Sequence, residues 1–255
     1  MNKLLFVLAF APAGFSQAPT APPPIVRMTC QSGFSRGPEL PYAYVKAAVD
    51  VLGMSSVTGI PQTWTIELHN NFASIEDLDK AIAATDRINP RDGYAEPHDE
   101  LLAPPRAMIA LYEPELSYRP DEAVRLLPKA RYMGIAVHRI RLGMEAEFEQ
   151  LVRLRKFTAD SINLNRPELA YRVVSGAPAG TYLLMAPLVN LRSMDEGVPD
   201  LPPFAAPVLD ERAKNAAKEA EVEIGREHLI FRLEPRLSYV SDEFAAVDEA
   251  FWRVK

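Results

Sequence analysis

The sequence predicts a mixed α+β chain in which two tandem βαββαβ repeats pack sheet to sheet. Three observations support this prediction. The motif EPELSY at 113–118 returns as EPRLSY at 234–239, a glycine-x-proline turn precedes an apolar extended segment in each half, and a serine with an acidic residue three positions later follows each segment. The spacing between matching positions changes only from 117 to 121 residues along the chain, as it would after a duplication with few loop insertions.

The first repeat is expected to open with a strand over 25–31 and a helix that ends at Gly53. The helix is predicted from apolar residues at i, i+3, i+4 and i+7. These residues are Val45, Ala48, Val49 and Leu52. After a glycine turn, residues 63–69 (TWTIELH) alternate as a strand does. Ser74 then predicts a second helix, because Asp77 completes a capping box, and a strand that carries the LSY motif closes the repeat.

The second repeat is expected to follow the same order. A strand over 133–140 (MGIAVHRI) leads through Gly143 to a long helix, and residues 181–189 (TYLLMAPLV) form the second strand of a hairpin. A second helix should end at Gly225 before the last strand. The two helical stripes are Phe148, Leu151, Val152, Ala159 and Ile162, and Leu209, Ala213, Ala216, Ala217 and Ala220. Strand, helix, strand, strand, helix, strand is the ferredoxin-like order.

A four-stranded sheet with both helices on one face leaves its other face apolar, so the two halves are expected to cover each other. The segments 131–151 (RYMGIAVHRIRLGMEAEFEQL), 171–184 (YRVVSGAPAGTYLL) and 230–240 (IFRLEPRLSYV) resemble the dimeric α/β-barrel superfamily, in its antibiotic-biosynthesis-monooxygenase-like and NIPSNAP-like branch, fused in tandem. The resemblance covers about residues 25–255 and implies two ferredoxin-like repeats closed as an intrachain dimeric α/β barrel. The superfamily mixes cofactor-independent oxygenases, haem-handling enzymes, isomerases and members without known chemistry, so it implies no particular cofactor.

The chain start has the layout of a secretory signal. Lys3, an apolar run from Leu4 to Ala11 and small residues before Ser16 predict cleavage after that serine. The run is shorter than the roughly 20 residues that span a membrane, so a cleaved signal is preferred to a retained anchor. The expected division is a signal peptide at 1–16, a Pro-rich tether at 17–24, repeats at 25–120 and 131–255, and a linker at 121–130. The protein is expected to be exported to the periplasm or beyond the cell, without membrane attachment after cleavage.

Composition narrows the range of partners. The net charge of -6 and a pI near 5.4, with dispersed Lys and Arg, argue against nucleic acid as a partner. Cys30 is the only cysteine, so no intrachain disulfide is possible. The paired repeats predict a monomer that is an intrachain pseudo-dimer, or a higher homo-oligomer.

Two short motifs match patterns of functional sites. Residues 33–37 spell G-x-S-x-G, the pattern of a hydrolase nucleophile elbow. Only one strand precedes Ser35 and prolines separate it from the next helix, so a connecting loop is favoured. His98, Asp99 and Glu100 resemble a weak cation site, although a solvated loop cluster explains them better. The four histidines have no metal-ligand spacing, and no metal site is predicted.

Five residues are predicted as candidates for a ligand pocket. They are His138, His69, Glu67, Tyr182 and Trp64. Alternation puts Glu67 and His69 on one face of their strand and Trp64 on the other, and it puts His138 on the face of Ala136. One face of each strand should meet helices while the other lines the barrel. These histidines therefore either point into a pocket or are buried in the core with their ring nitrogens hydrogen-bonded. Trp64 and Tyr182 follow the glycine-x-proline turn of their own repeat at related positions, which favours a packing role for both residues.

Two functions remain open from the sequence. The lack of an activated nucleophile, a metal cluster or a phosphate-binding loop favours an exported protein that binds a small molecule or a partner without catalysis. The resemblance implies the alternative, a cofactor-independent monooxygenase-like or haem-handling enzyme that acts on a small aromatic ligand. In that case His138 or His69 would transfer a proton. A small-molecule ligand is the expected partner in both cases.

Overall fold

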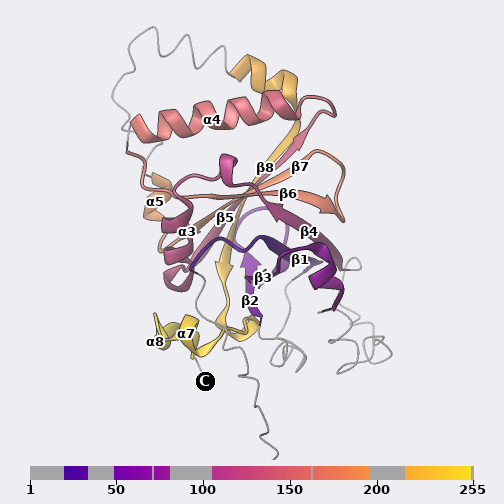
Figure 1. Ribbon diagram of the computed structural model, residues 1–255. Coiled ribbons are helices and arrows are strands. Elements are labelled where there is room, and N and C mark those ends of the chain that lie inside the picture. The colour runs from indigo at the N-terminus through magenta and orange to yellow at the C-terminus, as the bar shows by residue number, and fades with distance from the viewer. Residues whose placement is uncertain are drawn as a thin grey trace, which may run out of the picture.

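Eight antiparallel strands close into a barrel in the order β1-β3-β2-β8-β5-β7-β6-β4 (Figure 1). The computed structural model describes residues 20–33, 49–70, 72–80, 105–161, 163–195 and 216–253. The strands are β1 Ile25–Ser32, β2 Asp50–Ser56, β3 Gln62–His69, β4 Arg106–Tyr112, β5 Tyr132–Ile140, β6 Leu169–Ser175, β7 Thr181–Leu188 and β8 Glu223–Leu233. The mixed α+β class and the closed barrel predicted from the sequence are confirmed.

The ring consists of two sets of four neighbouring strands. The first four strands lie together in the order β4-β1-β3-β2, and the last four lie in the order β8-β5-β7-β6. Two seams join the sets. One pairs β2 with β8 from Met54 opposite Leu233 to Ser56 opposite Phe231, and the other pairs β4 with β6. Because every strand has two neighbours among these eight, the barrel has no free sheet edge.

Helices pack outside the barrel. They are α3 Pro120–Leu126, α4 Glu145–Ser161, α5 Arg192–Asp195, α7 Asp242–Ala245 and α8 Glu249–Trp252, with 3-10 turns η2 Pro114–Leu116, η3 Leu127–Lys129 and η4 Pro235–Leu237. Residues 75–80 and 216–222 are also helical. Figure 1 shows α4 lying across one side of the second set of strands. Among the residues that the structure describes, no helix is long and apolar enough to cross a membrane.

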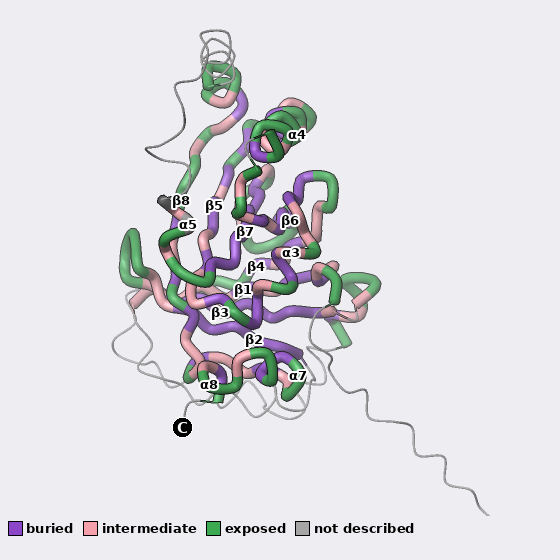
Figure 2. The backbone as a smooth tube through the Cα atoms, turned by 90° about the vertical axis from the view of Figure 1, so that its left-hand side faces the viewer, coloured by how far each residue is buried: buried purple, intermediate pink, exposed green. Residues whose placement is uncertain are grey.

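The barrel interior is a packed core. One cluster of buried side chains draws on all eight strands, which places it inside the ring. Its strand members are even-numbered in β1 to β4 and odd-numbered in β5 to β8, as strand alternation requires. Trp64 of β3 and Phe231 of β8 meet beside the seam between β2 and β8, with ring centroids 4.9 Å apart, and they are 6% and 0% exposed. Figure 2 shows the strands as the most buried part of the chain.

The first copy of the repeated motif fastens the end of β4 to the start of β6. The Glu113 N–H donates to the Ala170 carbonyl oxygen at 2.9 Å, and the Ala170 N–H donates to Ser117 Oγ at 2.9 Å. Ser117 Oγ itself donates to the Glu113 carbonyl oxygen at 3.0 Å. Tyr118 and Glu168 then exchange two backbone hydrogen bonds of 2.9 and 2.8 Å. We call this arrangement of residues 113–118 the first clasp.

The second copy makes the same bonds in the other direction. The Glu234 N–H donates to the Gly53 carbonyl oxygen at 2.8 Å, and the Gly53 N–H donates to Ser238 Oγ at 2.9 Å. Tyr239 and Val51 exchange two backbone hydrogen bonds of 2.6 and 2.8 Å. This second clasp, residues 234–239, fastens the end of β8 to β2. Each set of four strands therefore holds the second strand of the other set, which explains why the chain repeats these letters.

The helix predicted to end at Gly53 is wrong over the described residues, because Asp50–Ser56 is strand β2. Its first five residues are all buried, so the segment lacks the polar alternation of a half-exposed strand and its apolar spacing matched a helix by coincidence. Residues 34–48, which include Val45 and Ala48, lie outside the described residues, as do Ser35 and the remainder of the G-x-S-x-G motif after Gly33.

Other boundaries also differ from the predictions. The LSY motifs do not lie in strands, because β4 and β8 end before them and each EPxL segment forms a 3-10 turn. Gly225 lies inside β8 and does not end a helix. The predicted linker at 121–130 is ordered as α3 and η3. The capped start at Ser74 is confirmed, since Asp77 Oδ2 accepts the Ser74 N–H at 3.2 Å.

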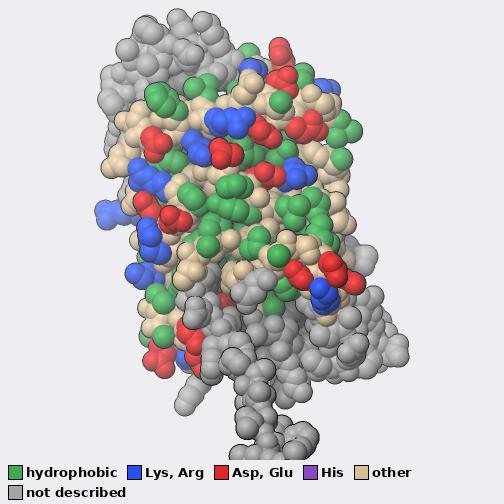
Figure 3. Space-filling view, viewed as in Figure 1, with side chains coloured by type: hydrophobic (Ala, Val, Ile, Leu, Met, Phe, Trp, Pro, Cys, Tyr) green, Lys and Arg blue, Asp and Glu red, His purple; other side chains and the backbone are tan. Residues whose placement is uncertain are grey.

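Charges of both signs alternate over the surface. Figure 3 shows Lys and Arg interspersed with Asp and Glu on this face, with hydrophobic side chains between them. The described residues also form ion pairs at the surface, such as Arg172 with Glu113 at 2.7 Å and Arg153 with Glu149 at 3.3 Å. A mixed surface of this kind on the face in view offers no continuous basic track to a nucleic-acid backbone.

Candidate functional site

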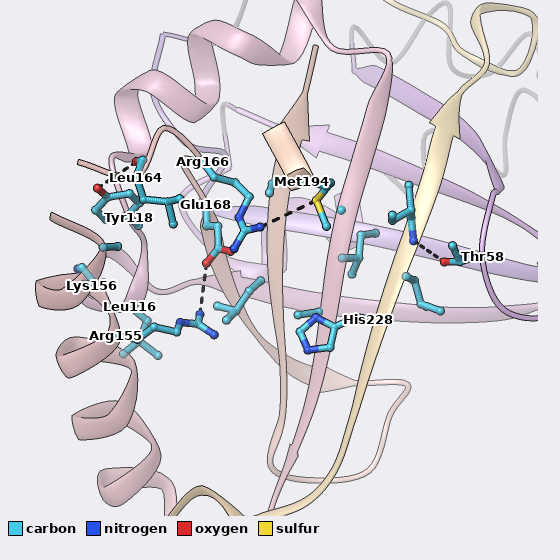
Figure 4. A pocket seen from close by; sticks show the side chains of 18 residues that line it. Thr58, Leu116, Tyr118, Arg155, Lys156, Leu164, Arg166, Glu168, Met194 and His228 are labelled. Atoms are coloured by element: carbon cyan, nitrogen blue, oxygen red, sulfur yellow. Dashed lines mark hydrogen bonds and ion pairs between the residues drawn. The ribbon is translucent and has the colours of Figure 1, made fainter. Parts of the chain in front are cut away.

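A cavity of about 270 Å³ lies on the outer face of the second set of strands, under the C-terminal half of α4 (Figure 4). Two rows of paired residues across β8, β5 and β7 form its floor. One row joins Ile230, Gly134 and Ala186, and the next joins His228, Ala136 and Leu184. Except for His228, the floor is apolar.

Small side chains create the space between sheet and helix. An added Cβ at Gly134 would lie 3.8 Å or more from its nearest neighbours, so the glycine leaves open volume above the sheet. Farther along the same strands the row of Arg226, His138 and Tyr182 is bulky, and Tyr182 packs on Phe148 of α4 with ring centroids 4.8 Å apart. The sheet and α4 therefore touch at one end of the helix and leave a gap at the other.

Cations gather at the mouth of the cavity. Arg155 and Lys156 come from α4, and Arg166 comes from the loop before β6. Arg155 pairs with Glu168 at 3.3 Å, and Lys156 Nζ donates to the Glu115 carbonyl oxygen at 2.7 Å. Three cations thus face one carboxylate among the residues known to line this cavity, and the mouth carries a net positive charge.

His228 is the titratable ring on the floor. Burial lowers the pKa of His228 below its ordinary value, and electrostatic interactions with His138, Arg226 and Arg155 lower it further. The imidazole is therefore neutral at pH 7 and has one donor and one acceptor nitrogen. At the other side of the cavity the Tyr118 hydroxyl donates a hydrogen bond to the Leu164 carbonyl oxygen at 3.3 Å. The hydroxyl proton of Tyr118 is therefore already used in a hydrogen bond.

We expect NMR titration of His228 to give a pKa below 6.5, its value without these neighbours. Replacing Arg226 with glutamine removes one of the positive charges and should raise that pKa. The unfolded imidazole takes up its proton at a higher pH than the folded one, so the free energy of unfolding should fall as the pH drops through 6.5. A wild-type pKa at or above 6.5 would contradict the environment described for this ring.

A buried polar network adjoins the cavity. His138 Nδ1 lies 3.1 Å from Glu223 Oε1, and Arg226 Nε donates to Glu223 Oε2 at 2.8 Å. Burial alone would raise the pKa of Glu223, but the hydrogen bonds from His138 and Arg226 lower it overall. The His138 ring lies 6.4 Å from the His228 ring, edge to face, and 5.3 Å from Phe148. His138 is thus held under α4, next to the cavity wall.

The other sequence candidates lie elsewhere. His69 Nε2 is 3.0 Å from Glu67 Oε2, and Arg27 pairs with Glu67 at 3.2 Å on the outer face of the first set of strands. The His69 ring stacks on Phe72 at 4.2 Å. Trp64 points into the barrel, where its Nε1 donates to Gln62 at 2.8 Å. The five candidates therefore do not form one site, and His98, Asp99 and Glu100 lie outside the described residues.

The two outer faces differ in chemistry. In β4, β1 and β3 the rows at the places of the cavity floor are Ile109, Arg27 and Glu67, and Ala107, Thr29 and Thr65. The ion pair of Arg27 with Glu67 stands there in place of Gly134 and Ala186 of the second set. The cavity floor is therefore a property of the second set of strands.

Cys30 is no nucleophile, because burial raises its pKa to about 12 and keeps it protonated.

Sequence reasoning missed His228, Arg166 and the small residues of the floor. The one available signal was the run of small residues facing one side of the strands, at Gly134, Ala136 and Ala186. Among the part of the chain that the structure describes, no group of three or more His, Cys, Asp or Glu side chains could hold a metal ion.

Comparison with known proteins finds solved structures whose fold is similar to that of this chain. No protein-family model matches the chain, and no curated protein matches it. An anthrone oxidase-like protein of solved structure is 11% identical, with 82% of this chain and 91% of that chain covered and a TM-score of 0.50. A proposed monooxygenase from Fusobacterium nucleatum is 8% identical, with 86% and 94% covered and a TM-score of 0.49. A mutant chlorite dismutase from Candidatus Nitrospira defluvii is 9% identical, with 89% and 95% covered and a TM-score of 0.46.

The anthrone oxidase-like protein, at a TM-score of 0.50, has a similar overall fold, which agrees with the predicted barrel. Membership of the dimeric α/β-barrel superfamily and of its NIPSNAP-like branch stays a prediction. Identities of 8 to 11% do not transfer a reaction or a ligand from any neighbour to this chain.

Proposed function

We propose that the protein binds a small, planar, mostly apolar molecule in the cavity under α4, without catalysis. The observation that carries this proposal is the floor of Gly134, Ala136 and Ala186, which leaves an apolar gap between packed layers. A volume of about 270 Å³ lies just below the range of roughly 300–1,000 Å³ typical of ligand pockets. The cavity therefore suits a molecule of one or two fused rings.

Haem does not fit this cavity as the described residues form it. A tetrapyrrole is much larger than a ligand of one or two rings. His228 is the one imidazole among the cavity's known lining residues, and its neighbours lower its pKa without fixing a ring nitrogen toward the space above the floor. Haem is therefore not assigned to this cavity.

A second candidate is a cofactor-independent oxygenase. The observation that favours it is a neutral histidine on the cavity floor, since such a ring accepts a proton from a phenolic ligand. Oxygen uptake in the presence of a bound hydroquinone separates the candidates. Uptake that exceeds the rate without protein, and that His228→Asn removes, would favour the oxygenase.

We further propose that the chain arose by tandem duplication of a ferredoxin-like unit. The two clasps support this, because they bond reciprocally at positions 117 or 121 residues apart. The matching strand orders of the two sets support it as well. Export also stays a prediction, since residues 1–16 lie outside the described part of the chain.

Filling the cavity tests the binding proposal. In Ala186→Leu the larger side chain occupies the space above the floor, and affinity for the neutral probe 2-naphthol should fall about tenfold, since overpacking commonly costs about 1–3 kcal/mol. Titration of probe fluorescence measures this. Ala250→Leu adds the same side chain at an exposed position of α8 and serves as the control. Equal affinity of the two variants, or no binding by the wild type, would refute the proposal.

A further inference from the structure

Arg166 is a charged side chain of the cavity mouth that lacks a charged partner. Its guanidinium is partly buried, and its hydrogen bond is Nη1 to Met194 Sδ at 4.0 Å, a weak acceptor (Figure 4). Over the residues that the structure describes, no carboxylate lies within ion-pair distance of Arg166, whereas Arg155 is already paired with Glu168. Removing a charge from water without a partner is costly, so an anion is the group this position favours.

We infer that the ligand is a planar aromatic carboxylic acid whose carboxylate pairs with Arg166 while its rings lie on the small-residue floor. This inference rests on the proposed function, since it specifies the ligand class of the same cavity. A guanidinium presents two parallel N–H donors that match the two oxygens of a carboxylate. Glu168, close by in the sequence and at the same mouth, disfavours a ligand of higher negative charge.

The backbone around Arg166 is held firmly. Pro167 follows it and restricts the conformation of the arginine to the extended region. Glu168 then enters the first clasp through two backbone hydrogen bonds to Tyr118. The guanidinium is thus carried by a short segment anchored to the barrel, and little order has to be gained when an anion binds.

The opposite side of the cavity specifies a second group on the ligand. Figure 4 shows His228 across the cavity from Arg166. A neutral imidazole on an otherwise apolar floor accepts a hydrogen bond from a hydroxyl group. A hydroxyl at the far end of the ring system from the carboxylate completes the match, so hydroxylated aromatic acids are the members of this class that should bind best.

Three probes test this ligand class: 2-naphthol, 2-naphthoic acid and 6-hydroxy-2-naphthoic acid, titrated at pH 7.5 with the wild type. Both acids should bind at least tenfold more tightly than 2-naphthol. Arg166→Gln should abolish that preference, so that the acids bind no more tightly than 2-naphthol to the same variant. Arg153→Gln removes one charge from the outer side of α4, where Arg153 pairs with Glu149, and should keep the preference. Circular dichroism confirms that each variant is folded.

The outcomes separate this inference from the proposed function. If 2-naphthol binds and Ala186→Leu weakens it, but the acids bind no better or Arg166→Gln keeps their advantage, the carboxylate assignment is refuted and the cavity proposal stands. If no probe binds the wild type, both are refuted. His228→Phe should remove the advantage of the hydroxylated acid over 2-naphthoic acid, and an unchanged ratio would refute the role of His228.

Discussion

Replacing Gly53 with alanine should lower the free energy of unfolding by about 3 kcal/mol or more. A Cβ at this position would overlap the Leu237 carbonyl oxygen and lie 2.5 Å from the Leu237 carbonyl carbon and Cβ. These are atoms of the second clasp, and most are backbone, so they cannot rotate away. The clasp would have to lift from β2 and lose the hydrogen bond from the Gly53 N–H to Ser238 Oγ. Urea unfolding followed by circular dichroism measures the change.

Gly134→Ala is the matched control for this experiment. It is also a strand glycine, but its added Cβ would meet no atom closer than 3.8 Å. Removing a glycine from a strand without a clash stabilises by about 0.5–1 kcal/mol, so this variant should be at least as stable as the wild type. If Gly53→Ala matches the wild type in stability, the close seat of the second clasp on β2 is wrong.

Trp64→Ala should lower the free energy of unfolding by about 3–5 kcal/mol. Its ring is 6% exposed and packs on Phe231 inside the barrel, so truncation leaves a void that the surrounding strands cannot close. The exposed Phe157 of α4, at 73%, is the matched aromatic control, and Phe157→Ala should stay within about 0.5 kcal/mol of the wild type. Thermal and urea unfolding measure both.

Ligand binding distinguishes a packing role for Trp64 from a site role. Trp64→Ala protein that is still folded should bind 2-naphthol with wild-type affinity, because the proposed cavity lies on the other side of the sheet. Loss of binding without loss of stability would instead place a ligand site in the barrel interior. That result would restore Trp64 as a pocket residue and contradict the packed core.

The sequence was sufficient for elements whose faces differ. In β3 apolar and polar residues alternate, and α4 carries an apolar stripe, so the positions of both elements followed from periodicity. β2 was missed because its first five residues are buried on both sides, by the barrel core and by the second clasp. This burial depends on a contact between residues 185 positions apart, Gly53 and Ser238. A local sequence pattern cannot predict such a contact.

Less of the candidate site than of the fold could be predicted from the sequence. Its floor combines positions of β5, β7 and β8 that become neighbours through strand register alone, such as Ala136 between Leu184 and His228. The ring nitrogens of His69 and His138 drew attention as polar groups in apolar strands, and both proved to bond carboxylates under a covering layer. His228 lies in a polar stretch of β8. Its place in a cavity can be recognised only once the small residues of the neighbouring strands are known to lie beside it.

The reciprocal clasps also determine how the molecule could be taken apart. Each set of four strands ends in a clasp that forms backbone and serine hydrogen bonds with the other set, and each set contributes one side of both seams. Chain connectivity at α3 and η3 is not needed for any of those bonds. Fragments divided there and co-expressed should therefore reassemble into one barrel, whereas either fragment alone would expose unpaired strands and aggregate.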